Sequence, residues 1–171
     1  MKLYHGSNMA VEKPEIRKPT HGLDFGGGLY TTHNFEQAEE FAEKVVRRLA
    51  KAVAPVGVPT VSEYDFDIET AEKTLKILRF EKPDAEWLKF VVDNRKNIHK
   101  ESEYDLVIGP VANDDVYKTI KVFENGIYTA EETIRRLKVK ELFSQTLIKT
   151  DAALALLKFV KSTIIRVKGV L

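Results

Sequence analysis

Two short motifs near the start of the chain have the residue types and spacing of a ligand-binding site. The first spans residues 3–7 (LYHGS) and places His5 and Gly6 directly after a short apolar segment. The second spans residues 25–30 (FGGGLY), a glycine-rich turn that leads into Tyr30. Glycine lets a ligand approach the main chain, imidazole offers a hydrogen bond without a fixed charge, and a tyrosine ring offers a flat face. Together the motifs predict a site for a planar ligand.

In this order and at this separation, the motifs resemble the first two signatures of the ADP-ribosyltransferase superfamily, in its His-Tyr-Glu branch, which contains the poly-ADP-ribose polymerases. The resemblance implies that NAD is the co-substrate. It implies that His5 hydrogen-bonds the adenosine ribose, and that the backbone of Gly6 holds the nicotinamide carboxamide with Ser7 beside it. Tyr30 is then expected to stack on the nicotinamide ring, after a tight turn that Gly28 permits.

The third signature of that family is a glutamate at the start of a late strand, where its carboxylate binds the 2′-hydroxyl of the nicotinamide ribose. The matching position here is Gln145, directly before residues 146–149. An amide accepts the hydrogen bond but carries no charge, so chain elongation is not expected, which leaves single transfer, hydrolysis or no turnover. Glu141 is a second candidate, although its position favours a helix end. Ala38 stands where the polymerases have a serine, so weaker NAD binding is expected.

The resemblance thus predicts an NAD-dependent mono-ADP-ribosyltransferase with His5, Tyr30 and Gln145 as catalytic residues and a protein or nucleic acid as acceptor. Among small bacterial domains, the chain looks like a toxin-like branch encoded beside a small antitoxin, which would be its partner. Two alternatives stay open. One is a non-catalytic NAD- or ADP-ribose-binding or interaction module of the same fold, and the other is a transferase that modifies a small molecule.

Composition is that of one ordinary globular domain. The 171 residues are 43% hydrophobic and 31% charged, which predicts a single domain over residues 1–171. The net charge of +1 gives no global attraction to nucleic acid or to a membrane. The segment from Thr129 to Leu171 contains nine basic and four acidic residues. This excess favours a solvated pair of helices over a nucleic-acid or partner surface.

The chain contains no cysteine, which excludes disulfides, thiolate catalysis and zinc-thiolate sites. His33 and His99 have no second ligand at helical spacing, so no metal site is predicted. The first residues lack the apolar region of a signal peptide, and no apolar run is long enough to cross a bilayer. We therefore expect a cytoplasmic protein that does not enter the membrane.

Strands are expected singly among helices, without regular β-α-β spacing, which favours the α+β class. The resemblance refines this to an ADP-ribosyltransferase-like split antiparallel sheet flanked by helices. The strands are expected at residues 2–4, 60–66, 76–80, 104–108 and 145–149, and the helices at 35–50, 84–98, 113–124, 129–138 and 151–160.

Overall fold

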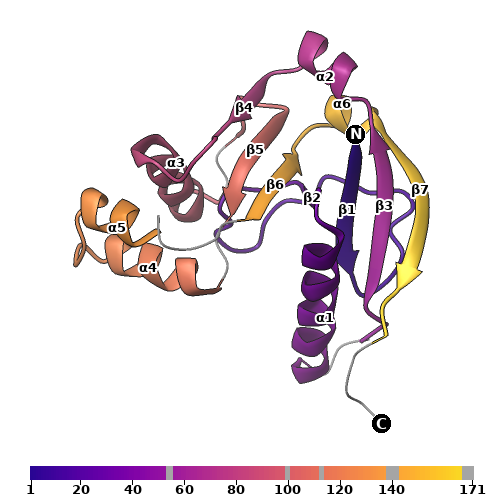
Figure 1. Cartoon of the computed structure of the whole chain (residues 1–171), viewed down its shortest axis with the longest axis horizontal. Helices are drawn as coiled ribbons and strands as arrows, with labels where there is room; N and C mark the ends of the chain where they lie inside the picture. The colour runs from indigo at the N-terminus through magenta and orange to yellow at the C-terminus, as the bar shows by residue number, and fades with distance from the viewer. Residues whose placement is uncertain (53–55, 99–100, 112–113, 138–142, 167–171) are drawn as a thin grey trace.

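A seven-stranded mixed sheet flanked by helices forms the part of the chain that the computed structural model describes, residues 1–52, 56–98, 101–111, 114–137 and 143–166 (Figure 1). The α+β class is confirmed. The strands are β1 (Lys2–Ser7), β2 (Leu29–Thr32), β3 (Thr60–Phe66), β4 (Ile77–Arg79), β5 (Leu106–Val111), β6 (Phe143–Ile148) and β7 (Leu157–Ile164). The helices are α1 (Phe35–Lys51), α2 (Ile68–Thr74), α3 (Ala85–Lys96), α4 (Asp114–Glu124), α5 (Ala130–Leu137) and α6 (Asp151–Leu154).

The strand order across the sheet is β4-β5-β6-β2-β1-β3-β7. Five of the neighbouring pairs run antiparallel, but β4 and β5 run parallel, so the prediction of a purely antiparallel sheet was wrong at this edge. A parallel pair needs a crossover connection. The chain supplies it with the long segment that contains α3.

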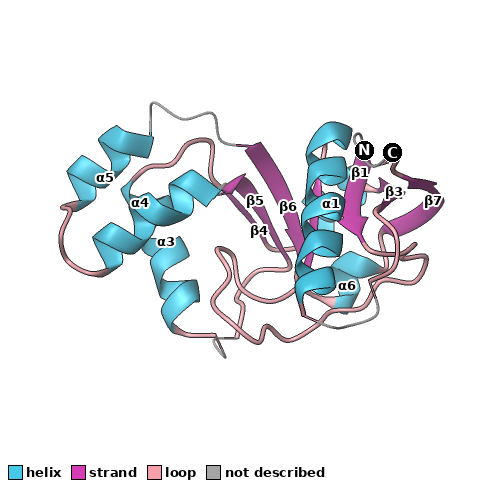
Figure 2. Ribbon diagram, turned by 90° about the horizontal axis from the view of Figure 1, so that it is seen from below, coloured by secondary structure: helices cyan, strands magenta, loops and turns pink. Residues whose placement is uncertain are grey.

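Each face of the sheet has its own hydrophobic core, because side chains alternate along every strand. On one face, α3, α4 and α5 cover β5 and β6, and Trp87, Val107 and Leu147 are buried between them. On the other face, α2 and α6 pack against Leu3 and Ile148. Figure 2 shows α3, α4 and α5 grouped together, with α1 standing apart from them beside β1.

Local capping explains where the helices begin. The Asn34 side chain accepts a hydrogen bond from the backbone of Gln37 and starts α1. The capping box at Thr129 and Glu132 forms in both directions, with N–H to side-chain distances of 3.0 and 3.2 Å. No helix in the described ranges is both long and apolar enough to span a bilayer.

Three segments differ from the expectation. Residues 157–164 form β7 instead of extending the helix that begins at Asp151, because they pair with β3 over its whole length. Among the described basic residues of this region, Arg135 and Arg136 therefore lie on α5 and Lys158 and Lys161 on β7, and not on two helices. Gly109 and Pro110 lie within β5 rather than ending it, and α2 had not been predicted.

Candidate functional site

The two predicted ligand motifs meet where β1 and β2 part. Within the described residues, the two strands are paired at one position, Tyr4 opposite Thr32. In contrast, β1 pairs with β3 at six consecutive residues, from Lys2 to Ser7. The strands therefore separate beyond Tyr4, and the His5-Gly6 pair lies on the side of β1 that is left without a regular partner strand.

The His5 ring bridges this separation. Its Nδ1 lies 2.8 Å from the backbone oxygen of Tyr30. A carbonyl can only accept, so Nδ1 carries the hydrogen and Nε2 is an acceptor in the neutral ring. Burial lowers the pKa of His5, with a smaller effect in the same direction from Arg17, while the bond to Tyr30 opposes the shift. The imidazole is thus a neutral group whose Nε2 can accept a hydrogen bond from a hydroxyl.

Gly6 is required by packing as well as by any ligand. A Cβ at this position would lie 2.1 Å from the Ala38 carbonyl and 2.8 Å from the Ala42 nitrogen, so α1 rests directly on β1 here. Ser7 follows on the same strand, and its hydroxyl donates to Asn8 at 3.4 Å. The structure thus brings His5, Gly6 and Ser7 together at one end of β1.

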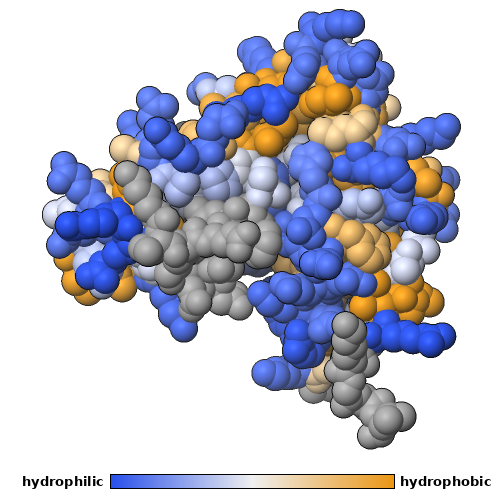
Figure 3. All heavy atoms as spheres, in the orientation of Figure 1, coloured by the Kyte–Doolittle hydropathy of each residue, from blue (hydrophilic) through white to orange (hydrophobic). Residues whose placement is uncertain are grey.

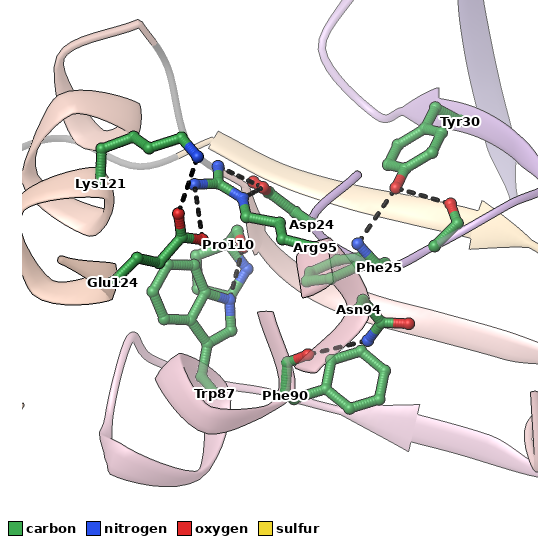
Figure 4. A network of polar contacts seen from close by, with 11 residues as sticks. Asp24, Phe25, Tyr30, Trp87, Phe90, Asn94, Arg95, Pro110, Lys121 and Glu124 are labelled. Carbon is green, nitrogen blue, oxygen red and sulfur yellow. Dashed lines mark hydrogen bonds and ion pairs between the residues drawn. The ribbon is translucent and has the colours of Figure 1, made fainter. Parts of the chain in front are cut away.

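Tyr30 is tied to the glycine turn. Its hydroxyl accepts from the backbone of Phe25 at 3.1 Å and donates to the Gly26 carbonyl at 3.0 Å (Figure 4). Burial raises the pKa of Tyr30, so the phenol stays protonated. Gly28 adopts φ +145°, and a Cβ there would lie 2.3 Å from the Ile148 carbonyl. Packing against β6 and the hydrogen bonds of the Tyr30 hydroxyl therefore fix the shape of the turn. A ligand that stacked on Tyr30 would contact only a face of its ring.

Gln145 lies one strand away from this turn. It pairs with Thr32 on β2 and with Gly109 on β5, and its side-chain oxygen is buried without a hydrogen-bond partner. Thr32 bonds the Gln37 side chain of α1 at 2.5 Å, so an amide from a helix also reaches this point. Strand alternation puts Tyr30, Thr32 and Gln145 on one face of the sheet, whereas His5 lies on the opposite face and reaches across the separation. A buried acceptor without a donor is the feature that a ligand hydroxyl would satisfy.

Comparison with known proteins identifies the family to which this fold and site belong. A family model described as "Protein of unknown function (DUF3990)" matches residues 1–159. The chain belongs to the DUF3990 family. No curated protein and no solved structure matches the chain. The family match spans the two motifs and the site around Gln145, and it ends at residue 159, within β7.

A buried ionic network links the segment before the glycine turn to two helices (Figure 4). Asp24 pairs with Arg95 of α3 at 2.5 Å, and Arg95 lies 3.9 Å from Glu124 of α4. Lys121 holds the same glutamate at 3.0 Å. Asp24, directly before the glycine turn, is engaged in this network. No pattern in the sequence predicts this pairing, because a lone arginine in a helix usually faces solvent.

Lys149 holds the glycine turn from the opposite side. Its Nζ donates to the Phe25 carbonyl at 2.5 Å, and a Cβ at Gly26 would lie 3.0 Å from that nitrogen. The residue directly follows β6, and its place at the end of the expected strand does not predict this contact. Burial lowers the pKa of Lys149 from 10.5 to about 8. Tyr30 and Lys149 together hold the turn, so both position it for any ligand.

The lowered pKa of Lys149 predicts a pH-dependent contribution to stability. Above about pH 8 the folded protein releases this proton while the unfolded chain keeps it to about pH 10, so the free energy of unfolding rises with pH across this window. We expect Lys149→Met to lose that rise. Urea titrations at several pH values measure the difference, with Lys89→Met, at an exposed position of α3, as the control for loss of a surface charge. Parallel pH profiles for the wild type and Lys149→Met would contradict the assignment.

Two pockets lie away from the motifs. One of about 270 Å³ is bordered by Leu88 and Phe123, and another of about 340 Å³ by Phe80 and Pro110. Neither is lined by His5, Tyr30 or Gln145. We place the site at the point where β1 and β2 part, where the His5 ring contacts the Tyr30 backbone, because volume without polar groups does not select a ligand. Among the described residues there is no group of three or more metal-binding side chains.

Several other residues with functional side chains do not contribute to this site. His21 is exposed and contacts Thr20. Trp87 is buried in the core, and its indole nitrogen donates to the Pro110 carbonyl at 2.7 Å. Glu141, the helix cap expected at Asn113, and His99 lie outside the described residues.

Proposed function

We propose that the chain is an NAD-dependent mono-ADP-ribosyltransferase that transfers one ADP-ribose to a macromolecule and releases nicotinamide. The observation that carries the proposal is the 2.8 Å contact between His5 and the backbone of Tyr30 at the point where β1 and β2 part. It brings together two residues that are 25 positions apart and to which the resemblance of the two motifs, taken together, gives contacts with NAD.

The arrangement supports a division of roles. The neutral His5 ring offers Nε2 as an acceptor for a ribose hydroxyl, and the main chain of Gly6 lies beside it. The buried oxygen of Gln145 is an acceptor for a second hydroxyl, that of the nicotinamide ribose. In the reaction, the bond from C1′ to the nicotinamide nitrogen breaks, an acceptor nucleophile bonds C1′ and loses its proton to solvent, and nicotinamide leaves as a neutral molecule.

We extend the proposal to the physiological role that the resemblance suggests. A cytoplasmic toxin that consumes NAD and modifies a host macromolecule would need an inhibitor in the cell that produces it, and a small antitoxin protein would be that partner. No membrane partner is part of this proposal.

Gln145 favours one alternative function, a non-catalytic NAD- or ADP-ribose-binding module. An amide lacks the charge that stabilises a positively charged sugar in the transition state, and loss of such a group lowers rates by about 10²–10³. Free nicotinamide distinguishes the transferase from the binding module, because a binding module binds NAD without releasing nicotinamide.

Nicotinamide release tests the choice between them. Purified protein is incubated with NAD, free nicotinamide is measured by chromatography, and modified protein is measured by mass spectrometry. We expect slow release, single ADP-ribose adducts, and release by Gln145→Glu that is faster by about tenfold or more. Saturable NAD binding without release by either protein would establish the binding module. Ladders of polymer would show that Gln145 is not the third site residue.

A further inference from the structure

The strand β7 forms a long free edge of the sheet. It is the last strand in the sheet order and contains eight residues, whereas β4 at the other edge contains three (Figure 1, β7 in yellow). Among the described residues, β7 pairs with β3 alone. A free edge of this length offers a row of main-chain donors and acceptors to another strand.

The hydrogen-bond pattern shows which groups point outward. The backbone N–H of Ile165 donates to the Pro59 carbonyl. Every second residue pair of an antiparallel ladder is hydrogen-bonded, so the next hydrogen-bonded pair is Thr163 with Val61. Ser162 and Ile164 are thus the residues whose N–H and C=O groups point away from β3. Beyond the bulge, Asp67 donates to Leu156, and by the same alternation Leu157 and Phe159 point outward.

The side chains beside this edge are basic on one face and apolar on the other. Lys158 and Lys161 pair in register with Asp65 and Glu63, so both lie on the same face of the sheet. Lys158 is exposed and makes no ion pair with a described residue, and the Lys161 side chain is 64% exposed, with Glu63 at 3.7 Å. The opposite face carries Ile164, which is 66% exposed. Figure 3 shows hydrophobic and hydrophilic atoms interspersed along the side of the molecule where Figure 1 places β7.

We propose that β7 binds an extended segment of a partner protein by strand addition, and that this segment carries acidic residues on one face and apolar residues on the other. Main-chain bonds to the outward groups would supply affinity, and alternate side chains would supply specificity. Charge selects the occupant, because residues 152–166 contain three basic residues and no acidic one. The argument rests on the edge alone and does not depend on NAD chemistry.

The same features disfavour a second copy of the chain. Pairing β7 with another β7 would bring the lysines of two copies onto neighbouring strands, and like charges placed opposite one another are destabilising. The register shift between Glu63 and Tyr64 leaves Val160 as an extra residue on β7, which interrupts the regular ladder. Edge lysines and bulges are known to block non-specific strand pairing. A partner strand therefore needs acidic side chains opposite the lysines and a backbone that fits beside the bulge.

A labelled synthetic peptide of alternating valine and glutamate tests the proposal, against the same peptide with lysine in place of glutamate. We expect fluorescence anisotropy to show binding of the acidic peptide that is about tenfold tighter or more than that of the basic peptide. Ser162→Pro should weaken binding of the acidic peptide by about tenfold, because proline removes an outward N–H and leaves the hydrogen bonds to β3 intact. Ser162→Ala, which keeps the N–H, should bind as the wild type does.

A second variant tests the charge independently of the main chain. With Lys158→Gln and Lys161→Gln combined, the preference for the acidic peptide should disappear. Equal binding of the two peptides to the wild type, no binding of either, or unchanged binding by folded Ser162→Pro would overturn the proposal. Dimerisation of the wild type in sedimentation experiments that Ser162→Pro abolishes would assign the edge to a second copy instead.

Discussion

Arg95→Met is expected to lower the free energy of unfolding by about 3–5 kcal/mol, the range for removing one partner of a buried ion pair. Only 7% of the Arg95 side chain and 9% of the Asp24 side chain are exposed, and Glu124 is equally buried. The substitution removes the guanidinium that both carboxylates face. Because Asp24 precedes the glycine turn, the loss should also loosen the turn that carries Tyr30.

Urea denaturation measures this effect as a lower midpoint. The matched control is Arg79→Met, since Arg79 pairs with Glu72 at 2.7 Å but both side chains are about half exposed. Exposed pairs of this kind contribute about 0–1 kcal/mol. If the two variants lose similar amounts of stability, the network around Arg95 is not the structural link described above.

Gly28→Ala is expected to cost about 3 kcal/mol or more, because two unfavourable effects combine. The φ of +145° lies in a region that residues other than glycine rarely adopt. The new Cβ would lie 2.3 Å from the Ile148 carbonyl, a backbone atom that cannot move without disturbing the pairing of β2 with β6.

The control for the backbone effect is Gly126→Ala. Gly126 has φ +73°, and a Cβ there would meet no atom within 4 Å. That substitution should cost about 1–2 kcal/mol from the backbone conformation alone. Thermal unfolding of the two variants separates the clash from the conformational cost. Equal losses would mean that β2 and β6 are not packed at Gly28 as described.

The secondary structure followed from sequence where local signals agreed. The β3 prediction is confirmed at both ends, since Pro59 precedes it and Asp67 caps the next helix. The start of α1 at Phe35 follows from Asn34. The β7 segment could not be predicted in this way, because its apolar residues suit a helix equally well and only pairing with β3 decides between the two.

The candidate site could be predicted from sequence only in part. The motifs predict His5 and Tyr30 as site residues, and the structure places the ring of one against the backbone of the other. What sequence could not provide are contacts between distant segments. Asp24 and Arg95 are 71 residues apart, and Phe25 and Lys149 are 124 residues apart, with no periodic pattern linking either pair. The Tyr30 hydroxyl and the glycines therefore also stabilise the turn itself.

Calorimetric titration with NAD tests the central claim, that NAD binds where β1 and β2 part, most directly. The experiment compares the wild type with His5→Ala and with His33→Ala, a control at an exposed histidine that contacts the Lys2 carbonyl at 3.2 Å. We predict saturable binding to the wild type and to His33→Ala, and binding weaker by about tenfold or more in folded His5→Ala, because a ribose hydrogen bond is lost. No saturable binding to the wild type, or equal affinity in all three proteins, would contradict the assignment.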